Sequence, residues 1–181
     1  MAVAKLYPNS GNPVIESNDL TAVKIGSFKS QYPFDKADGN KMLDNGTAVI
    51  VDEANKKIKR PTTGKEVVGL HMSEERIYES HLGRKSFQLN GDVNIPRVGK
   101  LFKDDVFETN AVVMETTLDK ADATHAVAHT DGYWRLLTAA ELTGDGAVDL
   151  AEYAVVLIPS EEVMLPNGTL GFRFVVDKAG A

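Results

Sequence analysis

The chain has 181 residues, no cysteine and a formal net charge of −6. Its length suits one domain, or one domain with a long arm, while the lack of cysteine excludes disulfides, thiolate zinc sites and cysteine nucleophiles. An acidic chain gains nothing from counterion release on a phosphate backbone, so nucleic acid is not an expected partner.

Residues 1–45 differ in composition from the rest of the chain. They hold three of the seven prolines, Pro8, Pro13 and Pro33, and few consecutive apolar positions. Such a segment buries little surface per residue ordered. We therefore predict an extended N-terminal arm over residues 1–45, with a short strand at 22–25, followed by a β-domain over residues 46–181. An arm of this kind can become ordered against a partner.

Neither a signal peptide nor a membrane span is expected. The N-terminus lacks an apolar core of signal-peptide length, and the longest apolar run, residues 154–158, is too short to cross a bilayer. We expect synthesis in the cytoplasm and no membrane partner. Two Asn-Gly-Thr triplets, at Asn45 and Asn167, match the glycosylation pattern and are interpreted as turns.

From Gly46 to Ser80 the sequence reads as short β-type runs separated by turn residues. The pattern has period two and predicts strands at 47–51, 57–60 and 66–71. Ser73, followed by two glutamates, predicts the start of a two-turn helix that ends near Ser80.

The only basic cluster of the sequence falls at the first of these turns. Its members are Lys56, Lys57, Lys59 and Arg60. We interpret the cluster as a solvated hairpin tip, because Asp52 and Glu53 adjoin it.

Side-chain alternation predicts the register of two hairpins. A three-residue loop at 90–92 places apolar side chains on one face, and at the C-terminus an even loop at 166–169 does the same, with Pro166 kept in the turn. The predicted cross-strand pairs are Leu89 with Val93, Phe87 with Ile95, Leu165 with Leu170 and Val163 with Phe172.

Further strands are predicted at 106–109, 111–116, 125–128, 133–137, 154–158 and 170–176. Many short strands with turn signals and little helix predict a mainly β fold. We expect an antiparallel β-barrel or sandwich with an extended N-terminal arm and one or two short helices.

Residues 141–152, ELTGDGAVDLAE, resemble the calcium loop of EF-hand and dockerin proteins. The loop opens with Glu141 in place of aspartate, its third position is Thr143, and no long amphipathic helix flanks it. These departures favour an acidic loop between two β elements over a calcium site. The matching positions are Asp145, Gly146, Val148, Asp149 and Glu152.

This loop lies in an acidic stretch. Between Leu136 and Phe172 there is no lysine or arginine, and the six acidic residues in that interval equal the whole net excess. Whether the stretch faces solvent or a partner is left open. The six residues are Glu141, Asp145, Asp149, Glu152, Glu161 and Glu162.

The histidines and the single tryptophan do not form a recognisable site. His125 and His129 would share one face of a helix, but their context favours a strand, on which they lie about 13 Å apart, too far for one ion. We favour structural or surface roles for all four histidines, including His71 and His81. Trp134 is interpreted as a core or interface aromatic, with a sugar-stacking platform as the alternative.

No nucleophile elbow, phosphate-binding loop or dinucleotide fingerprint is present in the sequence. We therefore predict that the protein is not an enzyme. No catalytic, cofactor-binding or metal-ligating residue and no cofactor are assigned.

The segment NGTAVIVDEANKKIKRPTTGKEVVGLHMSEERIYES, the later segment RVGKLFKDDVFETNAV, a Trp-bearing strand and a C-terminal hairpin follow one another in this order. This layout, over residues 45 to 115, resembles the small structural proteins of tailed bacteriophage particles, in particular head decoration or cement proteins. The resemblance implies a virion protein on the capsid surface that binds the major capsid protein, with a homo-oligomer, most often a trimer, as the assembly.

Two other classes of function stay open. A calcium- or carbohydrate-binding β module would use the acidic loop or Trp134. Another virion role, such as a tail or connector protein, would use the same fold elsewhere in the particle.

Overall fold

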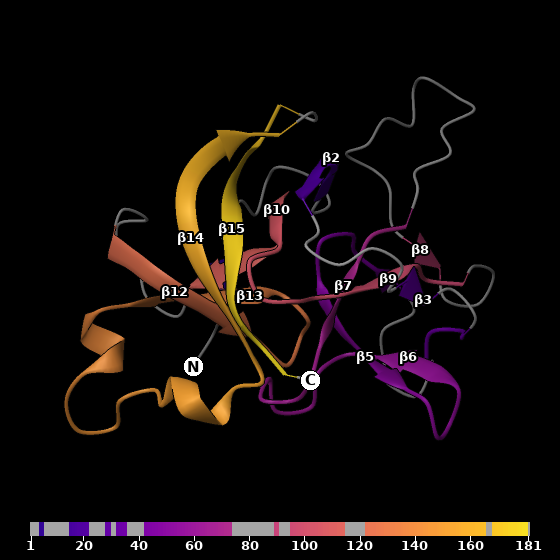
Figure 1. The fold of residues 1–181 in the computed structure, drawn as a ribbon, viewed down its shortest axis with the longest axis horizontal. Coiled ribbons are helices and arrows are strands. Elements are labelled where there is room, and N and C mark those ends of the chain that lie inside the picture. The colour runs from indigo at the N-terminus through magenta and orange to yellow at the C-terminus, as the bar shows by residue number, and fades with distance from the viewer. Residues whose placement is uncertain are drawn as a thin grey trace.

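The structure is a computed structural model that describes residues 4–5, 15–21, 28–29, 32–35, 42–73, 89–90, 95–114, 122–165 and 168–180. The described chain is mainly β, as the sequence predicts. Its strands form one eight-stranded, one five-stranded and one two-stranded sheet (Figure 1). The described helices are two single 3-10 turns, η4 (Ala140–Leu142) and η5 (Leu150–Glu152).

The eight-stranded sheet has the order β1-β11-β13-β12-β14-β15-β10-β2. Its central six strands, from β11 to β10, curl into a half-barrel. All neighbours are antiparallel except β11 and β13, which are parallel. The strands are β1 (Ala4–Lys5), β2 (Ile15–Thr21), β10 (Val106–Thr109), β11 (Val112–Met114), β12 (Ala123–Ala128), β13 (Trp134–Thr138), β14 (Val155–Met164) and β15 (Leu170–Ala179).

The five-stranded sheet has the order β3-β9-β7-β5-β6 and lies beside the half-barrel (Figure 1). A separate two-stranded sheet pairs β4 with β8. The strands are β3 (Phe28–Lys29), β5 (Ala48–Asp52), β6 (Lys57–Lys59), β7 (Gly69–His71), β9 (Val98–Lys100), β4 (Met42–Leu43) and β8 (Leu89–Asn90).

One hydrophobic core serves both large sheets. Its main cluster joins Leu70 and Leu101, from the region of the five-stranded sheet, to Phe107 and Trp134 of the half-barrel. The ring of Phe107 lies 5.9 Å from that of Trp134 and 5.7 Å from that of Phe174. Each such aromatic stabilises the fold by about 1.5–3 kcal/mol through burial. The two sheets are therefore packed as one unit.

The predicted register of the C-terminal hairpin is wrong by one residue. Val163 pairs with Gly171 and Met164 with Leu170. The Leu165 N–H donates to the Thr169 carbonyl at 2.8 Å, which leaves a three-residue loop at 166–168 in place of the predicted even loop. This loop requires a residue in the left-handed region, and Gly168 takes that role with φ +74°.

The strands also run further than predicted at this hairpin. β14 is one continuous strand from Val155 to Met164, where the sequence predicts a strand at 154–158 and a separate hairpin arm that includes Val163 and Leu165, and β15 continues to Ala179 beyond the predicted end at 176. The charged and polar residues of β14 tolerate strand conformation because their side chains are exposed. The result is a long two-stranded ribbon.

Other predicted strands are confirmed within a few residues, from the β5–β6 hairpin to the strands at 106–109 and 134–138. Three predicted features lie outside the described residues: the strand at 22–25, the helix after Ser73 and the hairpin partners Phe87 and Val93. Ile95 lies outside any strand and is 51% exposed. The division of the chain after residue 45 stays a prediction.

Candidate interaction surfaces

Segments from the first 35 residues lie along the outer edges of both large sheets. β1 and β2 are the two end strands of the eight-stranded sheet, and β3 is one end strand of the five-stranded sheet. At the other end of that sheet, Phe34 forms a parallel bridge with Ile58 of β6. In the described chain, each outer edge of these two sheets is therefore formed or covered by the N-terminal region.

Two strands of the N-terminal region pair in the antiparallel direction, β2 with β10 and β3 with β9. Ile15 pairs with Thr109 at the start of β2 and Thr21 with Val106 at its end, with a register shift between them. In β3, Phe28 pairs with Gly99 and Lys29 with Val98 of β9. One segment thus pairs with strands of both large sheets.

Residues 32–35 fix this segment to the domain. Phe34 is 2% exposed and packs in a cluster with Ile58. The Asp35 N–H donates to the Ile58 carbonyl at 2.7 Å, and the Ile58 N–H donates to the Pro33 carbonyl at 2.9 Å. The Tyr32 hydroxyl donates to the Glu53 carboxylate at 2.6 Å. The contacts combine a buried ring with main-chain bonds and form an anchor.

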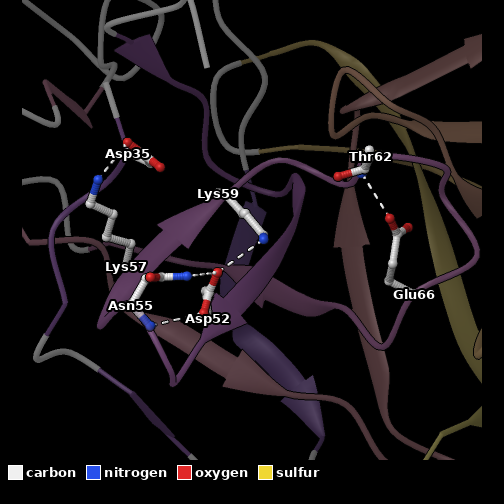
Figure 2. Close-up of polar contacts among 7 residues, drawn as sticks. All are labelled: Asp35, Asp52, Asn55, Lys57, Lys59, Thr62 and Glu66. Carbon is white, nitrogen blue, oxygen red and sulfur yellow. Dashed lines mark hydrogen bonds and ion pairs between the residues drawn. The ribbon is translucent and has the colours of Figure 1, made fainter. Parts of the chain in front are cut away.

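The basic cluster lies on the β5–β6 hairpin, as predicted, and two of its lysines, Lys57 and Lys59, have acidic partners (Figure 2). Lys57 Nζ lies 3.0 Å from Asp35 and Lys59 Nζ 3.0 Å from Asp52. Asp52 also accepts from the side chain and the backbone N–H of Asn55, and these bonds, followed by Lys59, hold its pKa well below the usual range. The charges of these two lysines are therefore balanced locally.

The loop that follows β6 is closed by Glu66. Its carboxylate accepts from the backbone N–H groups of Thr62 at 3.0 Å and Thr63 at 2.9 Å, and Figure 2 shows the contact with Thr62. Gly64 lies in this loop with φ +79°, and a Cβ there would lie 2.1 Å from the Ala128 carbonyl oxygen. The loop is thus held tightly against the half-barrel.

β14 lies inside the sheet, but its residues 158–164 form a partial edge, which differs from the end edges that the N-terminal region covers. β12 pairs with β14 only at Val156 and Leu157, and within the described residues β15 is the one strand paired with 158–164. This stretch carries Pro159, which has no N–H, a register irregularity between Pro159 and Glu161, and the adjacent acid Glu162. Proline, bulges and charges all weaken strand addition. The sequence itself therefore blunts this edge.

Arg173 on β15 connects the two kinds of edge. Its guanidinium donates to Glu108 of β10 at 2.7 Å and also pairs with Glu161 of β14. The Glu108 side chain is 5% exposed, whereas that of Glu161 is 52% exposed. Glu108 therefore depends on Arg173 far more than Glu161 does.

The tip of the β14–β15 ribbon exposes apolar side chains. Met164 and its cross-strand partner Leu170 are 66% and 36% exposed. The neighbouring Leu165 is buried and lies over Gly171, where a Cβ would approach its Cδ1 to 2.7 Å. The Asn110 side-chain amide donates to the Thr169 hydroxyl at 2.8 Å and fixes the tip. Figure 1 shows this ribbon extending beyond the other strands of the sheet.

The carboxylates of the calcium-like loop are directed to separate partners. Glu141 accepts from Arg135 at 3.1 Å and from the Thr138 N–H at 2.9 Å. Asp149 caps η5 and Glu152 pairs with Lys65. No group of three potential metal ligands occurs among the described residues. The structure does not bring the carboxylates of Glu141, Asp149 and Glu152 to one site, and the 12-residue stretch forms a loop with two 3-10 turns, as the favoured interpretation of an acidic loop between β elements expects.

Trp134 is a core residue, as the first interpretation held. It is completely buried, and its indole N–H donates to the Gly46 carbonyl at 2.9 Å. No face of the ring is left for sugar stacking. His125 contacts Thr124, and His129 lies 2.9 Å from Asp131, so both have local partners. His81 lies outside the described residues.

A buried polar network that sequence reasoning missed surrounds His71. If His71 Nδ1–H donates to the Asp44 carbonyl at 2.7 Å, then Nε2 accepts from the Ser73 hydroxyl at 2.8 Å. Burial lowers the pKa of His71 to about 4, against the opposing hydrogen bond to Asp44, so the ring is neutral at pH 7. The sequence His-x-Ser on a strand places both side chains on one face, which is the signal that could have revealed the pair.

The network extends on both sides of this pair. The Arg97 N–H donates to Ser73 Oγ at 3.1 Å, and the Asn45 side chain exchanges two hydrogen bonds with the Ser73 backbone. The Tyr133 hydroxyl donates to the Asp44 carboxylate at 2.6 Å, and burial, followed by the Asp44 charge, raises the pKa of Tyr133. A serine beside a histidine is also the arrangement of an activated nucleophile. Here both hydrogen-bonding roles of the hydroxyl are used to join β7 to its neighbours.

Comparison of the chain with protein-family models, curated proteins and solved structures finds no match. No helix among the described residues is long and apolar enough to span a bilayer.

Proposed function

We propose that this protein is a head decoration protein of a tailed bacteriophage, which binds the outside of the capsid through the major capsid protein and stabilises the shell. The observation that carries the proposal is the pairing of the N-terminal region with the edges of both sheets. A segment that binds by edge pairing gives a β-domain a means to join neighbouring subunits. The resemblance over residues 45–115 points to the same class.

The geometry also suits a load-bearing protein. The two sheets share one core, and the polar groups around His71 are hydrogen-bonded to one another. Such an interior resists local opening, because separating the sheets would expose both apolar and polar groups. A protein that reinforces a pressurised shell requires this kind of rigidity.

The calcium and carbohydrate alternatives receive no support from the residues on which they rest. Glu141 pairs with the Arg135 side chain and Glu152 with the Lys65 side chain, and Trp134 lies in the core. A tail or connector role uses the same fold and differs only in location within the particle. The location is therefore the first property to measure.

The first experiment separates heads from tails of the phage that encodes the chain and measures the protein in each fraction by quantitative mass spectrometry. The decoration role predicts the protein in heads, at a fixed ratio to the major capsid protein. Presence in tails only, or absence from particles, would reject it.

The second experiment removes residues 1–31, which keeps Phe34 in place, and measures the copies bound per capsid. We expect occupancy to fall strongly, while a full-length Met164→Ser control keeps its N-terminal segment and its occupancy. Far-UV circular dichroism establishes that the truncated domain retains its strands. Undiminished binding of a folded truncated protein would show that the N-terminal segment does not hold the shell.

A further inference from the structure

We propose that the N-terminal strands β1, β2 and β3, called here the N-terminal segment, are exchanged between copies of this chain, so that the β10 and β11 edges of one copy are completed by the segment of a second copy. This inference goes beyond the proposed function and does not depend on it. It concerns the association of the chain with itself, which requires no capsid.

The edges of β10 and β11 are built to receive a strand. β11 consists of Val112, Val113 and Met114, all buried, and it contains no charge and no proline. β10 has one charged residue, Glu108, which is buried and paired with Arg173. Edges without proline, exposed charge or bulge require a covering strand in a soluble protein. By contrast, the β14 edge, to which no further strand is added in the described chain, carries such blunting residues.

The occupant that fits these edges is the N-terminal segment itself. Its strand β1 pairs with β11, and its strand β2 pairs with β10. β10 and β11 follow each other directly in the sequence. It then pairs with β9 through β3. A foreign strand would have to match three edges and the register shift along β10. A second copy of this chain carries the matching segment by identity.

The anchor at residues 32–35 defines what can be exchanged. Phe34 is buried in its own domain, so the chain from Tyr32 onward stays in place. Upstream of the anchor, the pairing that the structure describes consists of strand ladders along β11, β10 and β9. The same ladders form with the edges of a neighbouring copy. Exchange of an identical element in this way is an inexpensive route to an oligomer.

Cysteine cross-linking tests the exchange, because the natural chain has no cysteine. Thr21 and Val106 are cross-strand partners between β2 and β10. Antiparallel partners have Cα atoms about 4.5–5.5 Å apart, which suits a disulfide. Single variants Thr21→Cys and Val106→Cys are unfolded, refolded together and oxidised. We expect a two-chain disulfide product on a non-reducing gel.

A matched control replaces Val106→Cys by Glu162→Cys, which lies on the blunted strand β14 and is exposed. This pair is expected to give no cross-link above background. A Thr21→Cys/Val106→Cys double variant in one chain reports the same contact: with exchange, multi-chain products increase with concentration. Closure within single chains at every concentration, with no two-chain product from the mixed single variants, would overturn the proposal.

The unmodified chain supplies a second measurement that needs no variant. Sedimentation or light scattering should show at least twice the one-chain mass at high protein concentration. A one-chain mass throughout would also overturn the proposal. Because no capsid is present, either failure leaves the capsid-binding role to its own tests.

Discussion

The edge of β14 and the edges of β10 and β11 belong to the same sheet and solve the same problem in opposite ways. β14 carries Pro159, a bulge and two glutamates, which make the strand a poor template for another strand. β11 is apolar throughout, the one charge of β10 is the buried Glu108, and the two strands are covered by β1 and β2. A protected edge can therefore be encoded either in its own residues or in a distant segment of the chain.

The difference assigns separate roles to the two ends of the chain. An edge blunted by its own residues stays closed in every state of the protein. An edge covered by a separate segment can change its partner, because main-chain hydrogen bonds form equally well with the same segment from another copy. The N-terminal region is thus the part of this molecule that can connect it to others, and the C-terminal ribbon is kept from edge pairing.

The largest effect is expected from removal of residues 1–31. The loss of the β1, β2 and β3 ladders should lower the free energy of unfolding by on the order of 5 kcal/mol, and the bare β10 and β11 edges should cause self-association. Denaturant titration measures the first change and light scattering the second.

A synthetic peptide of residues 1–31 provides the control for this truncation. Added in excess, it should bind the exposed edges, raise the stability and suppress the association. A truncated protein as stable and as soluble as the full chain would show that the covering strands contribute nothing, and the comparison between the two edges would lose its basis.

The next largest effect is a loss of stability at acidic pH, which should arise in the five-stranded sheet. His71 pairs with Val98 of β9, the strand to which β3 is added. The folded protein lowers the pKa of His71 from 6.5 to about 4, so the unfolded chain binds a proton first. Stability is complete above pH 6.5, falls as the pH decreases from 6.5 to about 4, and the loss amounts to about 3 kcal/mol.

Denaturant titrations at several pH values between about 4 and 7 measure this loss, and a His71→Gln variant provides the reference. Carboxylates titrate in both proteins, so the difference between them isolates His71. An equal pH dependence of the two proteins would mean that His71 does not stay neutral in the folded state.

A smaller effect is expected at Arg173, which serves both edges. Arg173→Met leaves Glu108 buried without its guanidinium and should cost about 2 kcal/mol, less than for a fully buried pair because the Arg173 side chain is 40% exposed. Glu161→Gln removes only the exposed partner and should cost less than about 1 kcal/mol. Equal losses for the two variants would contradict the unequal burial of the two glutamates.

Much of the β framework could be predicted from the sequence. Period-two runs such as those at 47–51 and 106–109 contain their own strand signal, and the turn at 53–56 follows from local residues. Trp134 could be placed in the core because single aromatics in apolar strands are usually buried. These features depend on neighbours in the sequence.

Features that depend on distant residues could not be predicted. The hairpin at 166–168 differs by one residue because Leu165 packs over Gly171, a contact that side-chain alternation does not contain. β2 has the polar sequence IESNDLT, which gives no strand signal and pairs only because β10 offers an edge. The His71 network likewise combines residues 27 positions apart. Contacts between segments that are distant in the sequence are therefore the features that could not be predicted from local sequence patterns.

The smallest change in stability, with the clearest change in behaviour, is expected from restoring the edge of β14. Pro159→Val together with Glu161→Thr returns a backbone N–H at a half-buried position and removes a charge at an exposed one, so the free energy of unfolding should change by less than about 1 kcal/mol. Association should nevertheless increase, because the strand then resembles the uncovered form of β10. Light scattering as a function of protein concentration measures this association. Asp177→Asn, an exposed change of charge on the same ribbon, is the matched control and should leave the mass unaltered. If the restored strand associates no more than this control, proline and charge are not what keep β14 from pairing. The absence of such residues from β10 would then not explain why β10 is covered by another strand.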